Sequence, residues 1–288
     1  MIVSASRRTD IPATYSGWFF ERLRQGYALV PNPFNSVQVR RVSLAPEDVD
    51  CIVFWTKNAS PMLEKLDALK EHRYYFQFTI TCYENDVEKG LPVKEDILQT
   101  FIKLSDRIGP ERVLWRYDPV FLSPKYSLET HLKYFEKIAR MLQGYTEKCT
   151  ISFMDQYKSV EKRMQPLTPE PWTHEKMREA AKGFSEIAFS YGFGMDTCAE
   201  EIDLSDLDIR HAHCIDAERI ERLFGIQVDG GKDKYQRPAC GCAASVDIGV
   251  YNTCPGGCLY CYANYNTVLA VQNYTKHDTN APVLCGKE

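Results

Sequence analysis

Short apolar runs alternate with longer amphipathic stretches along roughly the first 200 residues of the chain. The apolar runs are rich in β-branched and aromatic residues, as buried strands are. They cover residues 2–5, 51–55, 74–81, 112–115, 150–153 and 193–197. Between them lie helix-like segments at residues 61–71, 94–108, 127–143 and 169–191. In the third of these, apolar residues from Leu128 to Leu142 recur at helical spacing, and Ser127 is a favourable residue to start the helix.

This alternation predicts a parallel sheet of about six β–α units, because consecutive parallel strands need a crossover connection, usually a helix. Residues 31–44 interrupt the pattern as either a hairpin or a long loop. A seventh strand-like run, residues 245–251, comes near the end of the chain, and a moderately helical stretch follows it at residues 264–273. We therefore predict an α/β fold with about six to seven units.

Three closely spaced cysteines, Cys254, Cys258 and Cys261, lie between the seventh strand and the last helical stretch. Their spacing is C-x3-C-x2-C. Three thiolates on one loop can bind three irons of a [4Fe–4S] cluster and leave the fourth iron open to another ligand. Gly256 and Gly257 permit the unusual backbone angles that a loop around a cluster requires, so both are candidate cofactor-binding residues. Zinc, which more often uses two pairs of ligands, is the alternative.

The motif resembles that of radical S-adenosylmethionine (SAM) enzymes, which carry C-x3-C-x2-C with an aromatic residue, here Tyr260, before the third cysteine. The string from Cys258 to Ala263 contains Cys-x-Tyr-Cys-Tyr and is similar to the spore photoproduct lyase branch. In that superfamily the motif usually lies near the N-terminus, whereas here it lies within the last 35 residues. The whole chain resembles a bacterial family of unknown function whose C-terminal cysteines mimic the N-terminal cluster site of radical SAM enzymes.

The resemblance implies a complete or partial (β/α) barrel in which the cluster-binding unit stands last instead of first, as in a circular permutation. Residues 1–226 would form the barrel core, and residues 227–288 would form a cysteine-rich iron–sulfur segment that completes it. A barrel places its first and last strands side by side, which is the geometry that permits permutation. We therefore expect residues 245–251 to lie beside residues 2–5.

Polar residues near the ends of predicted strands are candidates for the active site, because barrels build their active sites at the carboxyl ends of strands. The candidate catalytic residues are Arg7, Arg8, Asp10, Lys57, Arg116, Asp118 and Asp155. The basic members suit the carboxylate of SAM, and Asp118 and Asp155 suit its ribose or the substrate. Tyr260 or Tyr262 is placed to stack on the cofactor. The alternative is that these residues form structural ion pairs, such as Arg116 with Asp118.

Four more cysteines lie in the last quarter of the chain outside the motif, namely Cys214, Cys240, Cys242 and Cys285. Four thiolates are a full ligand set for a second, auxiliary [4Fe–4S] cluster or for a structural zinc. Plain thiols at Cys214 and Cys285 are the alternative. The remaining cysteines stand singly at the edges of apolar runs, so we predict buried thiols without a ligand role at Cys51, Cys82, Cys149 and Cys198.

Composition and charge limit the class of protein and the partners that this chain can have. The 288 residues are 44% hydrophobic and 26% charged, which is the balance of a globular protein with a real core. The formal net charge of −4 argues against a large nucleic-acid footprint. Eleven cysteines in such a chain indicate metal rather than disulfides. Because no apolar run reaches the length of a membrane span and the start lacks the order of a signal peptide, we expect a cytoplasmic protein with no membrane partner.

The resemblance implies reductive cleavage of SAM and abstraction of hydrogen from a substrate by the resulting 5′-deoxyadenosyl radical. The electron would come from an external donor of the flavodoxin or ferredoxin type. A small molecule or a nucleic-acid-derived compound is the expected substrate. Two alternatives remain open: a non-catalytic or electron-transfer iron–sulfur protein, and a barrel hydrolase or lyase that uses the acidic strand ends and a structural zinc.

Overall fold

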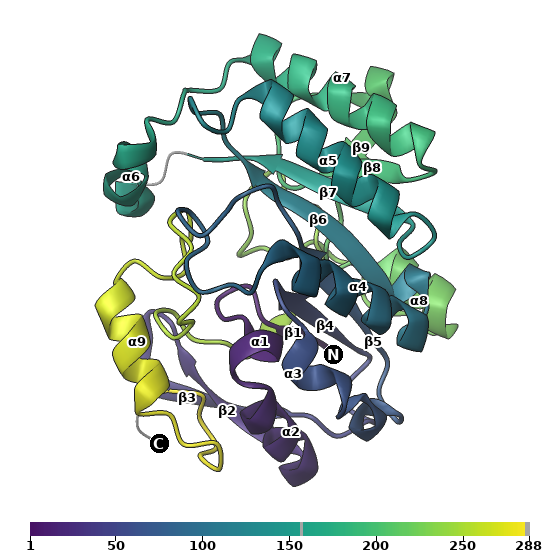
Figure 1. Cartoon of the computed structure of the whole chain (residues 1–288). Helices are drawn as coiled ribbons and strands as arrows, with labels where there is room; N and C mark the ends of the chain where they lie inside the picture. Colours follow the sequence, from purple (N-terminus) through teal and green to yellow (C-terminus); the bar gives the residue numbers. More distant parts are fainter. Residues whose placement is uncertain (156–157, 286–288) are drawn as a thin grey trace.

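The computed structural model describes residues 1–155 and 158–285, and its centre is a single eight-stranded sheet (Figure 1). Every pairing in this sheet is parallel. The strand order is β10-β1-β4-β5-β6-β7-β8-β9. The strands are β1 (Ile2–Ala5), β4 (Cys51–Thr56), β5 (Tyr74–Thr79), β6 (Val113–Val120), β7 (Lys148–Phe153), β8 (Gly194–Thr197), β9 (Ile209–His211) and β10 (Val246–Asp247). The predicted α/β fold with a parallel sheet is thus confirmed.

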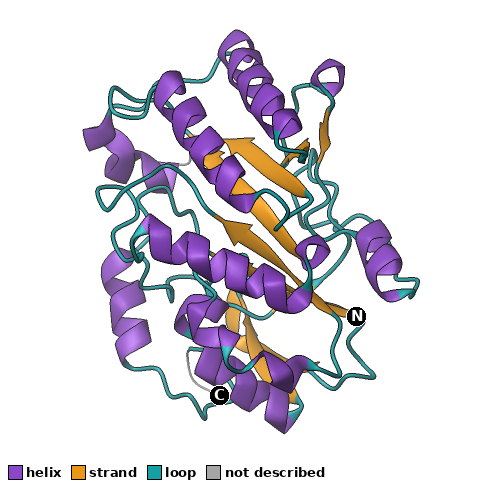
Figure 2. Ribbon diagram, turned by 45° about the vertical axis from the view of Figure 1, so that its right-hand side comes forward, coloured by secondary structure: helices purple, strands orange, loops and turns teal. Residues whose placement is uncertain are grey.

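Helices cover one face of this sheet (Figure 2). The larger ones are α2 (Ser16–Gln25), α4 (Lys94–Ile108), α5 (Leu128–Leu142) and α7 (His174–Ser190). α5 begins where the sequence predicts, because the Ser127 side chain accepts a hydrogen bond from the Thr130 amide and satisfies a free donor of the first turn. α4 ends at Gly109, whose φ of +97° is costly for any other residue.

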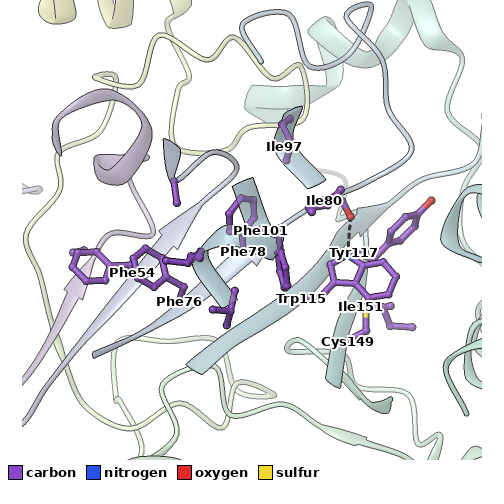
Figure 3. Packing of buried hydrophobic residues seen from close by; sticks show 14 of the residues in the cluster. Phe54, Phe76, Phe78, Ile80, Ile97, Phe101, Trp115, Tyr117, Cys149 and Ile151 are labelled. Carbon is purple, nitrogen blue, oxygen red and sulfur yellow. Dashed lines mark hydrogen bonds between the residues drawn. The ribbon is translucent and has the colours of Figure 1, made fainter. Parts of the chain in front are cut away.

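The core between helices and sheet is rich in aromatic rings (Figure 3). Phe54 and Phe76, on neighbouring strands, stack with ring centroids 4.7 Å apart. Phe78 on β5 meets Phe101 of α4 at 5.1 Å. The indole of Trp115 is fully buried and donates its N–H to the Ile80 carbonyl at 3.0 Å. Each such side chain contributes about 1.5–3 kcal/mol by leaving water, so this face accounts for much of the stability of the fold.

The opposite face of the sheet carries a second, smaller core, which includes Val53, Tyr75 and Leu114. The chain between β9 and β10, which includes α8 (Ala217–Phe224), packs over this second core. The hydroxyl of Tyr75 and the amide of Gln77 both donate to the carbonyl of Cys214, at 2.7 and 2.8 Å. Because these residues lie on β5, the segment around Cys214 is held against the middle of the sheet.

The last strand lies beside the first. β10 pairs in parallel with β1 through Val3 with Val246 and Ser4 with Asp247. The permuted arrangement requires this pairing. The expectation that residues 245–251 lie beside residues 2–5 is therefore confirmed. β10 and β9 are the two edges of the strand order. Closure of these edges into a barrel stays a prediction.

Several elements differ from the sequence prediction. Residues 31–44 belong to an antiparallel hairpin of β2 (Tyr27–Asn32) and β3 (Asn35–Ser43), outside the main sheet. The predicted helix at 61–71 is two short pieces, α3 (Ser60–Leu63) and a 3₁₀ turn at Leu66–Leu69. β9, α8 and the short helix α1 (Ile11–Thr14) were not predicted, because runs of four residues or fewer carry little periodicity and α8 is only eight residues long. Among the helices of the described residues, none is long and apolar enough to cross a membrane.

Candidate functional site

The loop that carries the cysteine triad, Cys254, Cys258 and Cys261, runs from β10 to α9 (Thr267–Thr275). Side chains of the first β–α unit hold its beginning. The hydroxyl of Tyr15 donates to the Thr253 carbonyl at 2.6 Å, and the Thr9 and Thr253 hydroxyls lie 2.7 Å apart. These contacts fix the triad loop at the carboxyl end of β1, where the sequence predicts the active site.

A buried carboxylate, Glu88, holds the middle of the triad loop. It is 1% exposed and accepts hydrogen bonds from the ammonium groups of Lys57 at 2.8 Å and of Lys94, from Thr81 at 2.9 Å, and from the hydroxyl of Tyr260. Burial alone would raise the pKa of Glu88, but the two ammonium groups hold it down at about 2. The carboxylate is therefore ionised and ties the ring of Tyr260 to β4, β5 and α4.

Backbone contacts join the triad loop to the segment after β5, and Figure 1 shows the two lying together. The Leu259 amide donates to the Val87 carbonyl and the Gly90 amide to the Gly256 carbonyl, both at 2.9 Å. A side chain at Gly90 would place its Cβ only 2.9 Å from that carbonyl oxygen. Gly257 has a φ of +65°. Gly90 therefore permits the close backbone approach, and Gly257 of the motif permits the turn.

The three thiols of the triad lie close enough for their charges to interact. All are free and partly buried, and burial raises the pKa of each thiol. Lys57 opposes this rise for Cys258 and Cys261. Among the described residues, no three Cys, His, Asp or Glu side chains are arranged to hold a single metal ion.

Arg7 lies next to the triad loop and has spare binding capacity. The Tyr262 hydroxyl donates to its carbonyl at 3.1 Å, and its guanidinium lies over the ring of Trp55 at 5.3 Å. Burial would lower the pKa of Arg7, but the charges of Cys242 and Asp247 raise it, so the group is cationic. Its Nη2 atom is buried and lacks a hydrogen-bond partner among residues 1–155 and 158–285. A buried, unpaired guanidinium N–H is an unfilled site for an anion.

The other predicted catalytic residues have structural partners. Arg8 lies over the ring of Tyr251 at 5.2 Å. Asp10 accepts from the Thr56 hydroxyl at 2.7 Å and the Lys57 amide at 2.8 Å, and it caps α1. Burial raises the pKa of Asp10 to about 6. Arg116 forms an ion pair with Asp118, and Asp155 forms one with Arg237. The ion-pair alternative therefore describes the observed contacts of Arg116 with Asp118.

The structure brings together a different cysteine quartet from the one predicted. Cys214 lies 3.6 Å from Cys198, and its thiol is also within hydrogen-bonding reach of Cys242, which in turn reaches Cys240. Cys198 was predicted to be a solitary buried thiol, and this is corrected. Cys285 instead lies near Tyr15, whose pKa is raised by burial and by the charges of Cys254 and Cys285.

Glu88 and Cys198 are the residues that sequence reasoning missed. Glu88 comes nine positions after the end of β5, too far along the loop for the strand-end rule to find it. Cys198 directly follows β8, so the same rule would have found it had thiols been counted with the polar residues. A hollow on the outer surface between α5 and α7, lined by Leu132, Glu136 and Glu179 among others, includes none of the predicted site residues.

The chain belongs to the family described as Domain of unknown function (DUF1848), whose family model matches residues 2–263. The matched region begins with β1 and includes the whole triad. No curated protein matches the chain. The matched region thus includes both cysteine groups, and the family description assigns no reaction to them.

Proposed function

We propose that the protein is a radical SAM-type enzyme in which Cys254, Cys258 and Cys261 hold a [4Fe–4S] cluster. One observation carries the proposal: the triad loop lies at the carboxyl ends of β1, β4 and β5 and is fastened there by the buried carboxylate of Glu88. Active sites of parallel α/β folds lie at this edge of the sheet. A three-thiolate site at this position leaves one iron open towards the groups at the strand ends.

The residues present fit a bound SAM. When loaded, the cluster with SAM supplies reductive cleavage of the sulfonium bond, and the protein supplies position and exclusion of water. Arg7 offers its unpaired Nη2 atom to a carboxylate. The Lys57 ammonium, which interacts with the charges of Cys258 and Cys261, favours the anionic thiolates. The Tyr260 hydroxyl donates to Glu88, which holds its ring beside the triad.

The circular order of the elements supports the proposal. β10, the triad loop and α9 form a strand–loop–helix unit that lies beside β1, the first strand of the chain. Read in a circle, this unit precedes β1 and occupies the first position of the sheet. That is the position that the cluster-binding unit has in radical SAM enzymes. The electron donor we propose is a flavodoxin or ferredoxin, and the substrate a small molecule or a nucleic-acid-derived compound.

Anaerobic reconstitution with ferrous iron and sulfide tests the proposal. We expect the reduced protein to give a cluster EPR signal that shifts on addition of SAM, and to release 5′-deoxyadenosine with dithionite. The triple variant Cys254→Ala, Cys258→Ala, Cys261→Ala should lose about four irons and the shift together. Cys149→Ala, which removes a thiol from the helix-covered core, should keep both. Zinc bound to the triad under conditions that load a known cluster protein would overturn the proposal.

A further inference from the structure

The second cysteine group, Cys198, Cys214, Cys240 and Cys242, brings three separate segments of the chain together. Cys198 follows β8, Cys214 follows β9, and the other two belong to the loop that leads to β10. The Cys198 and Cys214 sulfur atoms lie 3.6 Å apart. Cys242 contacts both Cys214 and Cys240. All four are free thiols, so the group is a continuous chain of thiols with Cys198 and Cys240 at its ends.

The contact between Cys198 and Cys214 suits a reversible disulfide. At 3.6 Å the two sulfur atoms are in van der Waals contact, whereas a disulfide bond is about 2.05 Å long. The sulfur atoms therefore need to approach by only about 1.6 Å for the bond to form. The two residues stand 16 positions apart, so such a bond would tie the end of β8 to the segment that follows β9.

Arg116 favours a thiolate at one of these two sulfur atoms. Its Nε and Nη2 atoms donate to Asp118, while its Nη1 atom donates to the Cys214 sulfur at 2.9 Å. A cation beside a thiol stabilises the thiolate, which is the nucleophile in thiol–disulfide exchange. The Cys214 sulfur is thus in contact with both a cation and a second thiol. Cys51, a thiol of the same core, instead donates to a backbone carbonyl 3.7 Å away.

The other two thiols connect this pair to the surface. Cys240 is 8% exposed and closely follows the exposed residues Arg237 and Pro238 of the loop before β10. Cys242 is 2% exposed, and its sulfur accepts a hydrogen bond from the Ile215 amide at 3.4 Å. Contacts between thiols therefore lead without interruption from the surface loop to the interior pair.

We propose that the second cysteine group is a site of thiol–disulfide exchange whose reactant is a low-molecular-weight aliphatic disulfide. Cys198 and Cys214 form a reversible disulfide in the interior, and the other two thiols carry the exchange to the surface. The proposal is independent of the function proposed for the triad, because none of its steps uses the triad thiols.

Each step is the attack of a thiolate on a disulfide sulfur. The Cys240 thiolate attacks the reactant, forms a mixed disulfide and releases a first thiolate. Cys242 then attacks the Cys240 sulfur and releases the second thiolate. Attack by Cys214 on Cys242 frees Cys240 again, and the final attack by Cys198 on Cys214 frees Cys242. In total the protein loses two electrons and two protons, and the reactant is reduced to two thiols.

The test is an anaerobic redox titration of the wild type, after reconstitution with ferrous iron and sulfide, in mixtures of reduced and oxidised glutathione. Samples are quenched in acid, the remaining thiols are alkylated, and mass spectrometry identifies the linked peptides. We expect a Cys198–Cys214 disulfide, with the loss of two alkylated thiols per chain, that disappears when reduced glutathione is in excess. Cys51→Ala, which removes a thiol of the same core, should match the wild type.

Cys240→Ser tests the route to the surface. We expect the Cys198–Cys214 disulfide to form about tenfold more slowly in this variant, because the thiol nearest the surface is missing. The glutathione ratio at the midpoint should stay that of the wild type, since Cys240 is not part of the final disulfide. A merely structural role of Cys240 would not separate the rate from the midpoint in this way.

Three results would overturn the proposal. Cys198 and Cys214 that stay unlinked at every glutathione ratio would exclude the interior disulfide, and this measurement on the wild type does not depend on the folding of a variant. Iron or zinc bound by the second cysteine group would do the same, because metal-bound thiolates are not free to exchange. An unchanged rate in Cys240→Ser would exclude the route through the surface loop. A triad that binds no iron leaves all three readouts as they are.

Discussion

Cationic side chains lie beside both cysteine groups, and they differ in how fully negative partners compensate their charge. Lys57 and Lys94 share the carboxylate of Glu88. Arg116 has Asp118 as well as the sulfur of Cys214. Arg7 keeps one guanidinium nitrogen unpaired. Because an unpaired buried donor costs about 1–3 kcal/mol, Arg7 is the residue most ready to gain from an anionic ligand.

Arg7→Gln should weaken SAM binding to the reconstituted protein by about tenfold to a hundredfold, since a charge-assisted hydrogen bond contributes about 1.5–3 kcal/mol. The measurement is a SAM titration of the EPR shift. Arg24→Gln is the control, because Arg24 is an exposed residue of α2 that pairs with Glu21. Equal SAM affinity in the Arg7 variant and the wild type would show that the carboxylate binds elsewhere.

Glu88→Gln should destabilise the fold by about 3–5 kcal/mol, because it leaves the ammonium groups of Lys57 and Lys94 without a buried counter-charge. Chemical denaturation monitored by circular dichroism gives the free energy of unfolding. Glu84→Gln, which removes an exposed partner of Lys125, should cost less than about 1 kcal/mol. A Glu88 variant as stable as the Glu84 variant would contradict the anchoring role.

The sequence identified the triad but not the residues that position it. Spacing alone marks Cys254, Cys258 and Cys261, because one short loop contains all three. Glu88 is 166 positions away from Cys254, and Cys198 is 16 positions away from Cys214, so only the folded chain brings each to its partner. The pairing of Arg116 with Asp118 was foreseeable because the two residues stand two apart on one strand.

The β–α units form from local patterns, and their fit to one another depends on buried polar contacts. α5 is an example, since its His131 is fully buried between the helix and β6. Its ring accepts from the Tyr117 hydroxyl at Nδ1, 2.9 Å away, and donates from Nε2 to the Phe121 carbonyl at 2.8 Å. Burial lowers the pKa of His131 from 6.5 to about 4. The ring is therefore neutral in the folded state.

His131 should make the fold less stable in acid. Between pH 6.5 and about 4 the unfolded chain binds a proton at this residue and the folded chain does not. The contribution of His131 to the free energy of unfolding is thus complete above pH 6.5. This contribution, on the order of 3 kcal/mol, is lost as the pH falls from 6.5 through 4. Denaturant unfolding at a series of pH values measures this. In His131→Gln the pH dependence should be smaller by that amount, and an unchanged slope would contradict the assignment.

Gly90→Ala should loosen the triad loop, because its Cβ would lie 2.9 Å from the Gly256 carbonyl oxygen. We expect a lower iron content of the triad and faster loss of iron to a chelator, while the free energy of unfolding changes by about 1–3 kcal/mol. Gly194→Ala is the control, since the nearest atoms to its Cβ would be 3.9 Å away. Equal chelator rates in the two variants would show that the loop tolerates the shift.

Elements with strong periodicity were predictable, and short ones were not. α5 and the central strands follow from apolar spacing. The 61–71 segment reads as one helix in sequence but is two pieces, and the segment around Cys214 packs on the sheet through Tyr75 and Gln77 rather than through a pattern of its own. Such packing depends on residues distant in sequence, so a local rule has no access to it.

The order of the strands is the property of the whole molecule that bears most on function. β10 lies beside β1 although about 240 residues separate them, so the two ends of the chain build one edge of the site. The sequence could predict this neighbourhood only through the resemblance to barrels with an N-terminal cluster unit. In the structure, the pairing of Val3 with Val246 and of Ser4 with Asp247 shows directly that β10 and β1 are neighbours.

If the cluster-binding unit is a displaced first unit, the chain should fold when its order is restored. A circular permutant would begin at Gly230, end at Asp229 and join Glu288 to Met1 through a flexible Gly/Ser linker; both residues at the cut are exposed. We expect native-like circular dichroism, the iron content of the wild type and an unchanged SAM response, because every contact between β10 and β1 is preserved. A permutant cut between Lys70 and Glu71, also exposed, controls for the linker. Loss of iron in the first permutant alone would mean that the covalent order of the last unit, and not only its place beside β1, is needed to form the site.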